Sequence, residues 1–549
     1  MTVLTSPRGE RSLGSGEYSS ILSNSGSRAD RNQQPSGKRH PSADSPWGKG
    51  GGVLSREDWL PLARKLDWDY SYVREEEVFP EVISGRPWLP HSEWKDWEES
   101  FKTSYREYVD NQYEKDMAVY AVRDAVGRLE NFQTLAAPWI NSLKVHAAAL
   151  PLAEFTGVIG NLRGARFGRD SAWRTMATFG ALDEYRHTQI PLLLFHQLVR
   201  WDSQFDWAHK FYHTNNWFAV AARHFFDELT LGQNAIEFHI ATNFILETGF
   251  TNLQFVGLAS LARESSDHMF ERMVTSIQTD EARHAQIGHP VLAVVMKHDP
   301  KYVQYLVDKW FWRNWRLFSI LTGLSTDYLT ALDQRPYSFK EFMEEWIIDQ
   351  FLRTLEEFGL KKPWYWDIFL DELDIYHHMI YASAYTYRAT LWFDFVIPSP
   401  AERKWLRQKY PKYWDDMDAV WEQVIERWRT TGTGAANELA VHGTAMPTFC
   451  DLCQLPLSAG TPRQNTANVL VQDGRKYIFC SEPCRWIFLQ EPERYANHKD
   501  IVKRVLSGEA PAQLPNLLTE YFRLTPDTWG TDVHHGNYDW LIARKASVA

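Results

Sequence analysis

The chain has 549 residues, of which 44% are hydrophobic and 14% aromatic, so it can fill a large core and general disorder is excluded. Its formal charge of −11 argues against nucleic acid as a partner, because neutralising a phosphate backbone requires a net basic face. Four cysteines are too few for a disulfide framework. Since no apolar run is long enough to span a bilayer and no secretory segment opens the chain, we expect no membrane partner and a cytoplasmic location.

Residues 1–52 differ in composition from the remainder of the chain. Twenty of them are Gly or Ser, few are large and apolar, and the segment ends in three consecutive glycines at 50–52. Such a stretch buries too little apolar surface to offset the entropy lost when it is ordered. The composition predicts a disordered tail, and a tethering role for it stays open.

Helical periodicity dominates residues 53–440, which we interpret as one large domain. Apolar residues recur every three or four positions through 113–129, 219–250, 269–296 and 339–358. Breaks are expected at Pro138, 164–168, 201–207, Pro336 and 398–400. A glycine-containing stretch at 432–434 resembles part of a dinucleotide fingerprint, but no strand precedes it, so a linker is the preferred interpretation.

Two copies of one five-residue pattern lie in this helical domain. The first is Asp183-Glu184-Tyr185-Arg186-His187, and the second, 97 residues later, is Asp280-Glu281-Ala282-Arg283-His284. In a helix, Glu and His three positions apart lie on one face, so each copy offers a carboxylate and an imidazole to the same point. A single Glu-x-x-His occurs by chance in a chain of this composition, but a duplicate that keeps the Asp and the Arg is far less expected.

Ferritin-like di-iron and di-manganese bundles use this pair of motifs together with one Glu from each of two further helices. Glu154 lies 30 residues before Glu184, and Glu247 lies 34 residues before Glu281. Each spacing fits two antiparallel helices joined by a turn. Four glutamates and two histidines form a ligand set suited to iron or manganese. The structural alternative is a cluster of buried ion pairs in which Arg186 and Arg283 neutralise the carboxylates.

Other polar residues near these motifs are candidates for supporting roles. Asp183 and Asp280 are suited to accept a hydrogen bond from the far nitrogen of a ligand histidine, and the alternative is that they are ordinary surface charges. The sequence does not show which aspartate would serve which histidine. Thr251 and Gln278 face the metal side if their helices are regular, where they would hold water or move protons, unless they are merely polar groups satisfied in the core. Asn252 is a weaker candidate for the same role.

The sequence resembles the hydroxylase α subunit of the bacterial multicomponent soluble di-iron monooxygenases, in the branch that oxidises toluene, alkenes and isoprene. The stretches that carry this resemblance are 101–105, 247–252, 276–281 and 362–366. It implies two Fe ions held by Glu154, Glu184, His187, Glu247, Glu281 and His284, and activation of O2 to insert one oxygen atom into a hydrocarbon. It also implies that Thr251 is the active-site threonine of the family.

The resemblance further implies an apolar substrate pocket, with plain core packing as the alternative for each of its residues. The implied wall consists of Leu150, Ala153, Gly157, Phe226, Leu246 and Phe255. Toluene-oxidising relatives usually have Phe at the position of Leu246, and Pro151 is expected to kink the first ligand helix or alter its start. Both features leave the particular substrate open.

No flavin or nicotinamide fingerprint is found in the sequence, so electrons must come from other proteins. The resemblance implies a β hydroxylase subunit, with a γ subunit in αβγ but not in αβ assemblies. It also implies a reductase fed by NAD(P)H, a Rieske ferredoxin in some systems, and a small effector protein. Alternative functions are a desaturase or a manganese catalase of the same fold, or a non-catalytic scaffold subunit. A complete ligand set argues against the scaffold.

All four cysteines lie in the last part of the chain, at 441–549, which we interpret as a separate α+β module with a C-terminal extension. Cys450-x2-Cys453 and Cys480-x3-Cys484 have the spacing of a four-thiolate zinc site, and the segment 477–495 resembles a YHS-type domain. A hairpin is expected around Asp473-Gly474 and a helix from about Glu482. Structural zinc is the preferred interpretation; metal-free thiols and a redox or iron role are the alternatives.

Overall fold

The fold is taken from a computed structural model that describes residues 66, 68–95, 103–129, 131–215, 217–386, 392–393, 397–431, 448–457, 468–513 and 516–521. The tail at 1–52 and the linker at 432–434 lie outside these residues. The chain divides into two compact units, Met1–Leu54 and Ser55–Ala549, and every described element belongs to the second.

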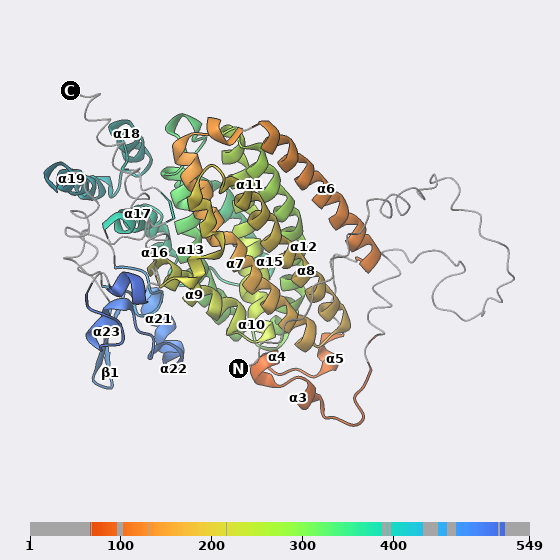
Figure 1. Ribbon diagram of the computed structural model, residues 1–549. Helices are drawn as coiled ribbons and strands as arrows, with labels where there is room; N and C mark the ends of the chain where they lie inside the picture. Colours follow the sequence, from red (N-terminus) through yellow and green to blue (C-terminus); the bar gives the residue numbers. More distant parts are fainter. Residues whose placement is uncertain are drawn as a thin grey trace, which may run out of the picture. The chain divides into compact units, whose positions relative to one another are not determined.

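Helices form almost all of the first part of this unit (Figure 1). In chain order these elements are α3 (Glu75–Val78), α4 (Glu81–Ser84), α5 (His91–Trp94), α6 (Tyr105–Leu129), η3 (Asn131–Thr134), α7 (Ala137–Phe167), α8 (Ser171–Leu198), η4 (Ser203–His209), η5 (Phe211–His213), α9 (Trp217–Phe226), η6 (Asp227–Leu231), α10 (Ala235–His239), η7 (Ile240–Thr251), α11 (Asn252–Glu264) and α12 (His268–His298). The mainly α fold class is thereby confirmed.

A second series of helices and a small strand pair follow. They are α13 (Pro300–Asp327), η8 (Leu332–Gln334), α14 (Phe339–Phe342), η9 (Met343–Ile348), α15 (Asp349–Glu357), α16 (Trp366–Glu372), α17 (Tyr376–Thr386), α18 (Pro400–Lys409), α19 (Trp414–Thr431), β1 (Asn468–Gln472), β2 (Arg475–Phe479), α21 (Glu482–Gln490), α22 (Pro492–Tyr495), α23 (Ile501–Leu506) and η11 (Leu517–Tyr521). No described helix is long and apolar enough to cross a membrane.

Local sequence explains where the long helices begin. Pro138 lies in the first turn of α7, where its missing N–H costs no helical hydrogen bond. Asp170, Asp267 and Asp299 cap α8, α12 and α13, because each side chain accepts a hydrogen bond from a backbone N–H in the first turn. Pro151 lies inside α7, which continues through it without a new start.

The periodicity at 219–250 predicted one continuous helix, but the structure divides this stretch into α9, η6, α10 and η7. Asn234 caps a new helix by accepting a hydrogen bond from the N–H of Glu237, so the chain breaks before α10. The π-helical segment η6 precedes this break, and the π-helical segment η7 follows α10. Since π-helical and α-helical segments share a similar apolar pattern, the sequence could not distinguish them.

The four long elements that carry the repeated motif and its partners pack in pairs. Helix α7 lies against α8, and η7 lies against α12, while α6 crosses α12. Gly288 allows the second pair to approach closely, because a Cβ atom there would lie 2.5 Å from the backbone nitrogen of Phe244. The core beside these helices is rich in aromatic residues, and Trp310, Trp312 and Trp315 of α13 are fully buried.

The small module contains the predicted hairpin and helix. Strands β1 and β2 are antiparallel, and Asp473 and Gly474 between them both have positive φ, as a two-residue type I′ turn requires. Ser481 caps α21 by accepting a hydrogen bond from the N–H of Cys484. Helix α21 packs against α13, so the module is attached to the bundle.

Candidate metal centre

The six side chains of the predicted ligand set come together between α7, α8, η7 and α12. Glu154 lies on α7, one Glu-His pair on α8, Glu247 on η7 and the other pair on α12. Both histidines are fully buried, and three of the four glutamates are 3% exposed. Carboxylates this deeply buried require counter-charges, because burying an isolated charge is very costly.

Each histidine directs its Nδ1 atom toward the glutamates. His187 Nδ1 lies 3.1 Å from Glu281, 3.7 Å from Glu154 and 3.7 Å from Glu184. His284 Nδ1 lies 3.5 Å from Glu184, 3.6 Å from Glu281 and 3.7 Å from Glu247. Glu184 and Glu281 therefore approach both imidazoles, as ligands that bridge two metal ions must.

The donor atoms form two overlapping sets. Glu154, Glu184, His187 and Glu281 form one set, and Glu184, Glu247 and His284 form the other, with the atoms of each set within 4.8 Å of one another. Both Nδ1 atoms are buried without a hydrogen-bond partner among the described residues. Buried polar atoms are rarely left without partners, and a bound cation at each set would supply the missing interaction. The residues thus fit a two-metal centre.

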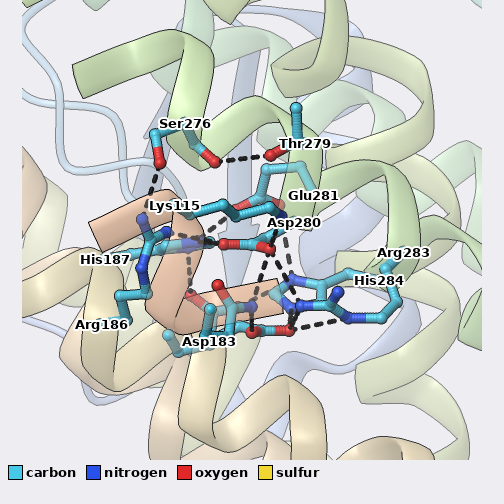
Figure 2. Close-up of polar contacts among 12 residues, drawn as sticks. Lys115, Asp183, Arg186, His187, Ser276, Thr279, Asp280, Glu281, Arg283 and His284 are labelled. Atoms are coloured by element: carbon cyan, nitrogen blue, oxygen red, sulfur yellow. Dashed lines mark hydrogen bonds and ion pairs between the residues drawn. The ribbon is translucent and has the colours of Figure 1, made fainter. Parts of the chain in front are cut away.

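The far nitrogens of the two histidines are held by the aspartates of the repeated motif, and the pairing is crossed (Figure 2). His187 Nε2 lies 3.3 Å from Asp280, and His284 Nε2 lies 3.0 Å from Asp183. Each motif therefore orients the histidine of the other copy. A carboxylate on the far nitrogen fixes the ring orientation and leaves Nδ1 free for a metal.

The two arginines of the motif form ion pairs with aspartates. Arg186 donates to Asp280 over 2.8 Å and to Asp116 over 2.5 Å, and Arg283 donates to both Asp183 and Asp280. Figure 2 shows Arg186 beside Asp280 and Arg283 beside Asp183. The arginines thus balance the aspartates that orient the imidazoles.

Helix α6 supplies a further layer that the sequence interpretation missed. Gln112 donates from its Nε2 atom to Asp183 over 2.7 Å and to Asp280 over 2.9 Å, so one amide bridges the two aspartates. Tyr108 donates to Asp183 over 2.9 Å, and Lys115 pairs with Asp280. The available signal was the spacing of these three residues at i, i+4 and i+7, which lines a single helical face.

Electrostatics around the ligands match their burial. Burial raises the pKa of Glu184 well above its usual range, and burial together with repulsion from Glu281 raises the pKa of Glu247 to about 7. Asn243, one turn before Glu247, donates to that carboxylate over 2.6 Å and so favours its charged form. A bound dication would likewise favour the charged form of these carboxylates, and so would lower their pKa values.

An apolar cavity with a volume of about 150 Å³ borders the ligand set. Its lining includes the six expected wall residues together with Thr251: Leu150, Ala153, Gly157, Phe226, Leu246 and Phe255. The hydroxyl of Thr251 is buried and has no hydrogen-bond partner among the described residues, so it is available to a guest in the cavity. Gln278 instead donates to Asn252 over 3.0 Å, and neither residue is among those that line the cavity.

The four cysteines form a second cluster, remote in sequence from the first. All are free thiols, and their sulfur atoms lie within 4.8 Å of one another. The Sγ atom of Cys480 lies 3.8 Å from that of Cys453 and 3.4 Å from that of Cys484. A tetrahedral site with Zn–S bonds of about 2.3 Å has sulfur–sulfur edges of roughly 3.8 Å, so the arrangement fits a zinc ion.

Comparison with known proteins identifies the same two parts. Residues 68–299 match the model of the methane/phenol/alkene hydroxylase family, and residues 463–499 match the YHS domain. The YHS match contains Cys480 and Cys484, while the other cysteine pair precedes it.

Similar proteins extend this match over most of the chain. The oxygenase component subunit alpha of the alkene monooxygenase system of Xanthobacter autotrophicus is 39% identical, over 89% of this chain and 97% of its own length. The oxygenase component of phenol 2-monooxygenase from a Pseudomonas species is 29% identical, over 85% and 90% of the two chains. The structure of phenol hydroxylase from Pseudomonas sp. OX1 aligns with a TM-score of 0.74 at 26% identity, over 86% of this chain and 95% of that one. The chain therefore belongs to the methane, phenol and alkene hydroxylase family.

Proposed function

We propose that this chain is the catalytic oxygenase subunit of a multicomponent monooxygenase, which holds two iron ions and inserts one atom of O2 into a small hydrocarbon. The observation that supports this most directly is the set of four glutamates and two histidines beside an apolar cavity, with both Nδ1 atoms turned toward the carboxylates. Membership of a family of monooxygenase components supports the reaction class.

The ligand roles follow from the two overlapping donor sets. One ion would be held by Glu154, Glu184, Glu281 and His187, and the other by Glu184, Glu247 and His284. When bound, iron supplies the electrons and open coordination positions at which O2 is reduced. Asp183 and Asp280 keep the imidazoles oriented, with Arg186 and Arg283 balancing their charge.

The remaining residues govern substrate, water and protons. The cavity wall excludes water and holds a non-polar guest against the glutamates. The hydroxyl of Thr251 is placed to accept or pass a proton at that boundary, and we propose that Gln278 and Asn252 serve the same proton path from outside the cavity.

A small alkene is the substrate that we favour. A dry protein cavity of about 150 Å³ accommodates a guest the size of benzene, and the cavity here has the same volume. Identity to the alkene monooxygenase subunit is higher than to the phenol hydroxylase component, 39% against 29%. Isoprene is smaller than benzene and toluene is larger by one methyl group, so both belong in the same assay as tests of the size limit.

The partners are proposed from the multicomponent character of the relatives. We assign β and γ hydroxylase subunits, an effector protein, and a reductase that takes electrons from NAD(P)H, with or without a Rieske ferredoxin. We also propose a cytoplasmic location for the assembly, where NAD(P)H would be available to the reductase.

We propose structural zinc for the cysteine cluster, with the hydroxylase domain at 53–440 and the cysteine module at 441–549. Four sulfur atoms at tetrahedral spacing support the zinc ion.

The function is tested by supplying the purified hydroxylase with reductase and effector and offering propene, isoprene and toluene in parallel. The expected result is hydrocarbon-dependent consumption of O2 and NAD(P)H with an oxygenated product. Release of O2 from peroxide without any reductant would indicate a catalase instead, and oxidation only of acyl chains bound to a carrier would indicate a desaturase. Two bound metal ions with no O2 consumption on any hydrocarbon would contradict the proposal.

A further inference from the structure

The cavity beside the metal-ligand set extends beyond the wall expected from the sequence. Besides Leu246 and Phe226, its lining includes Leu317 of α13, Cys453 and Leu455. The last two residues belong to the cysteine module, more than 200 positions away from Leu246 in sequence. The module therefore supplies part of the wall of the cavity that borders the glutamates.

The turn that gathers the cysteines also fixes Leu455. The N–H of Cys450 donates to the carbonyl of Leu455 over 2.9 Å, and the N–H of Gln454 donates to the carbonyl of Cys450 over 3.0 Å. Gln454 has a φ of 60°, which turns the chain sharply just before Leu455. The side chain of Leu455 is 4% exposed, so it is held at the cavity by the backbone of the cysteine turn.

Contacts with α13 hold this wall in place against the bundle. The indole N–H of Trp312 donates to Cys484 Sγ over 3.2 Å, and Arg316 donates to the hydroxyl of Ser481 over 3.2 Å. Trp312 is fully buried and Arg316 is 3% exposed. Since Arg316 also lines the cavity, α13 and the module meet in one packed interface beside the cavity.

We propose that the cysteine module sets the length of hydrocarbon that the enzyme accepts, with Leu455 as the residue that limits it. This inference rests on the proposed function, because it concerns the substrate of the same site. In this proposal, a terminal alkene places its double bond beside the glutamates and its other end against the α13 residues of the lining. Each further methylene that is buried strengthens binding roughly fourfold until the chain reaches the module, where added length meets Leu455.

The test compares the wild-type hydroxylase with Leu455→Ala and Leu455→Phe on linear terminal alkenes from propene to octene. We expect Leu455→Ala to raise kcat/KM for the longest alkenes relative to propene, by about fourfold or more for each additional methylene accommodated. We expect Leu455→Phe to lower the same ratio. Partition of hexene between headspace and metal-free protein supplies a second readout, because it reports cavity binding without catalysis.

Leu452 provides a matched control, since it is a leucine of the same turn that is fully buried and is not among the residues lining the cavity. Leu452→Ala should keep the wild-type ratio even where it lowers stability. If the larger changes at Leu455 prevent folding, Leu455→Val and Leu455→Met give the same comparison with smaller changes in volume.

The outcomes separate the two proposals. A wild-type enzyme that oxidises no hydrocarbon contradicts the proposed function. An enzyme that oxidises propene, but whose chain-length profile and hexene partition are the same in all Leu455 variants as in the wild type, overturns the role of the module.

Discussion

Each histidine of the site uses both ring nitrogens, and this double use explains why the repeated motif carries an Asp as well as a Glu. Nδ1 faces the glutamates while Nε2 is held by the aspartate of the other motif. Because the pairing is crossed, losing one aspartate would disturb the histidine of the opposite helix. The two motifs therefore act as one unit.

Removing one ligand should abolish metal binding at the centre. Glu247→Ala and His284→Ala each delete a donor from the set that also contains Glu184. We expect both variants to lose most of their iron while retaining a helical circular-dichroism spectrum, as measured by metal analysis after reconstitution. Glu264→Ala, at an exposed glutamate of α11, is the control. Wild-type iron content in Glu247→Ala would refute the ligand assignment.

Gln112 should influence both histidines at once. Its amide bridges Asp183 and Asp280, so Gln112→Leu leaves both aspartates with one donor fewer. Loss of such an outer hydrogen bond typically weakens metal affinity by about 10–100-fold. We expect a loss in this range in a competitive chelator titration, with a shifted iron absorption spectrum. Tyr113→Leu, on the exposed side of the same helix, should leave the metal affinity and the absorption spectrum unchanged. Equal metal affinities for the Gln112 variant and the wild type would mean that Gln112 only packs against the site.

His146 gives the stability a pH dependence. Burial lowers its pKa to about 4, whereas an unfolded histidine titrates near 6.5. Between these values the unfolded chain takes up a proton that the folded protein does not, so the free energy of unfolding falls as the pH decreases from 6.5 toward 4. From pH 6.5 to pH 5 this amounts to about 2 kcal/mol. His146→Leu should reduce the pH-dependent loss by that amount in urea unfolding, and an unchanged loss would contradict the assignment.

At the scale of elements, sequence reasoning located the six side chains that come together at the candidate centre, but not their outer partners. The duplicated pattern identified α8 and α12, and spacing identified Glu154 and Glu247. The sequence did not reveal Gln112 and Asn243 as outer partners, because each lies on a helix that carries no repeated motif. The π-helical geometry of η7 was equally invisible, since hydrophobic periodicity does not resolve it. The hairpin was predictable because Asp-Gly specifies a type I′ turn locally.

Close packing of α12 on η7 should be necessary for the centre. At Gly288 an added methyl group would lie 2.5 Å from Phe244 N and 2.8 Å from the carbonyl carbon of Asn243, which are backbone atoms that cannot move aside. Gly288→Ala must therefore separate the helices that carry Glu247, Glu281 and His284. We expect a lower melting temperature and weaker iron binding, measured by calorimetry and chelator titration.

The exposed face of α12 offers a comparison for this substitution. Thr279 lies on that face, and the Thr279→Ala variant should not have a lower melting temperature than the wild type. If Gly288→Ala melts at the wild-type temperature and binds iron normally, the close approach of the two helices is not required for the site.

At the scale of the whole molecule, the cysteine module is tied to the bundle by buried charge. Lys309 of α13 is fully buried and lies 2.8 Å from Glu491 of the module and 3.1 Å from Glu237 of α10. Tyr495 of the module donates to Glu228, which also pairs with Arg313 over 2.7 Å. The two interactions that reach the module, Lys309 with Glu491 and Tyr495 with Glu228, join residues more than 170 positions apart. Composition and periodicity could not reveal them, although the existence of two parts was evident from the cysteines.

Deleting the module should therefore destabilise the whole hydroxylase. A chain that ends at Thr431 keeps the bundle helices but exposes Trp312, Lys309 and Arg316. Each of these side chains loses a hydrogen-bond or ion-pair partner in the module and is left within an apolar surface. We expect this fragment to aggregate or to melt well below the full chain, and to bind iron weakly. A chain that ends at Tyr521 retains all the described contacts and serves as the control. A stable fragment ending at Thr431 that binds iron with the affinity of the full chain would show that the bundle folds independently of the module.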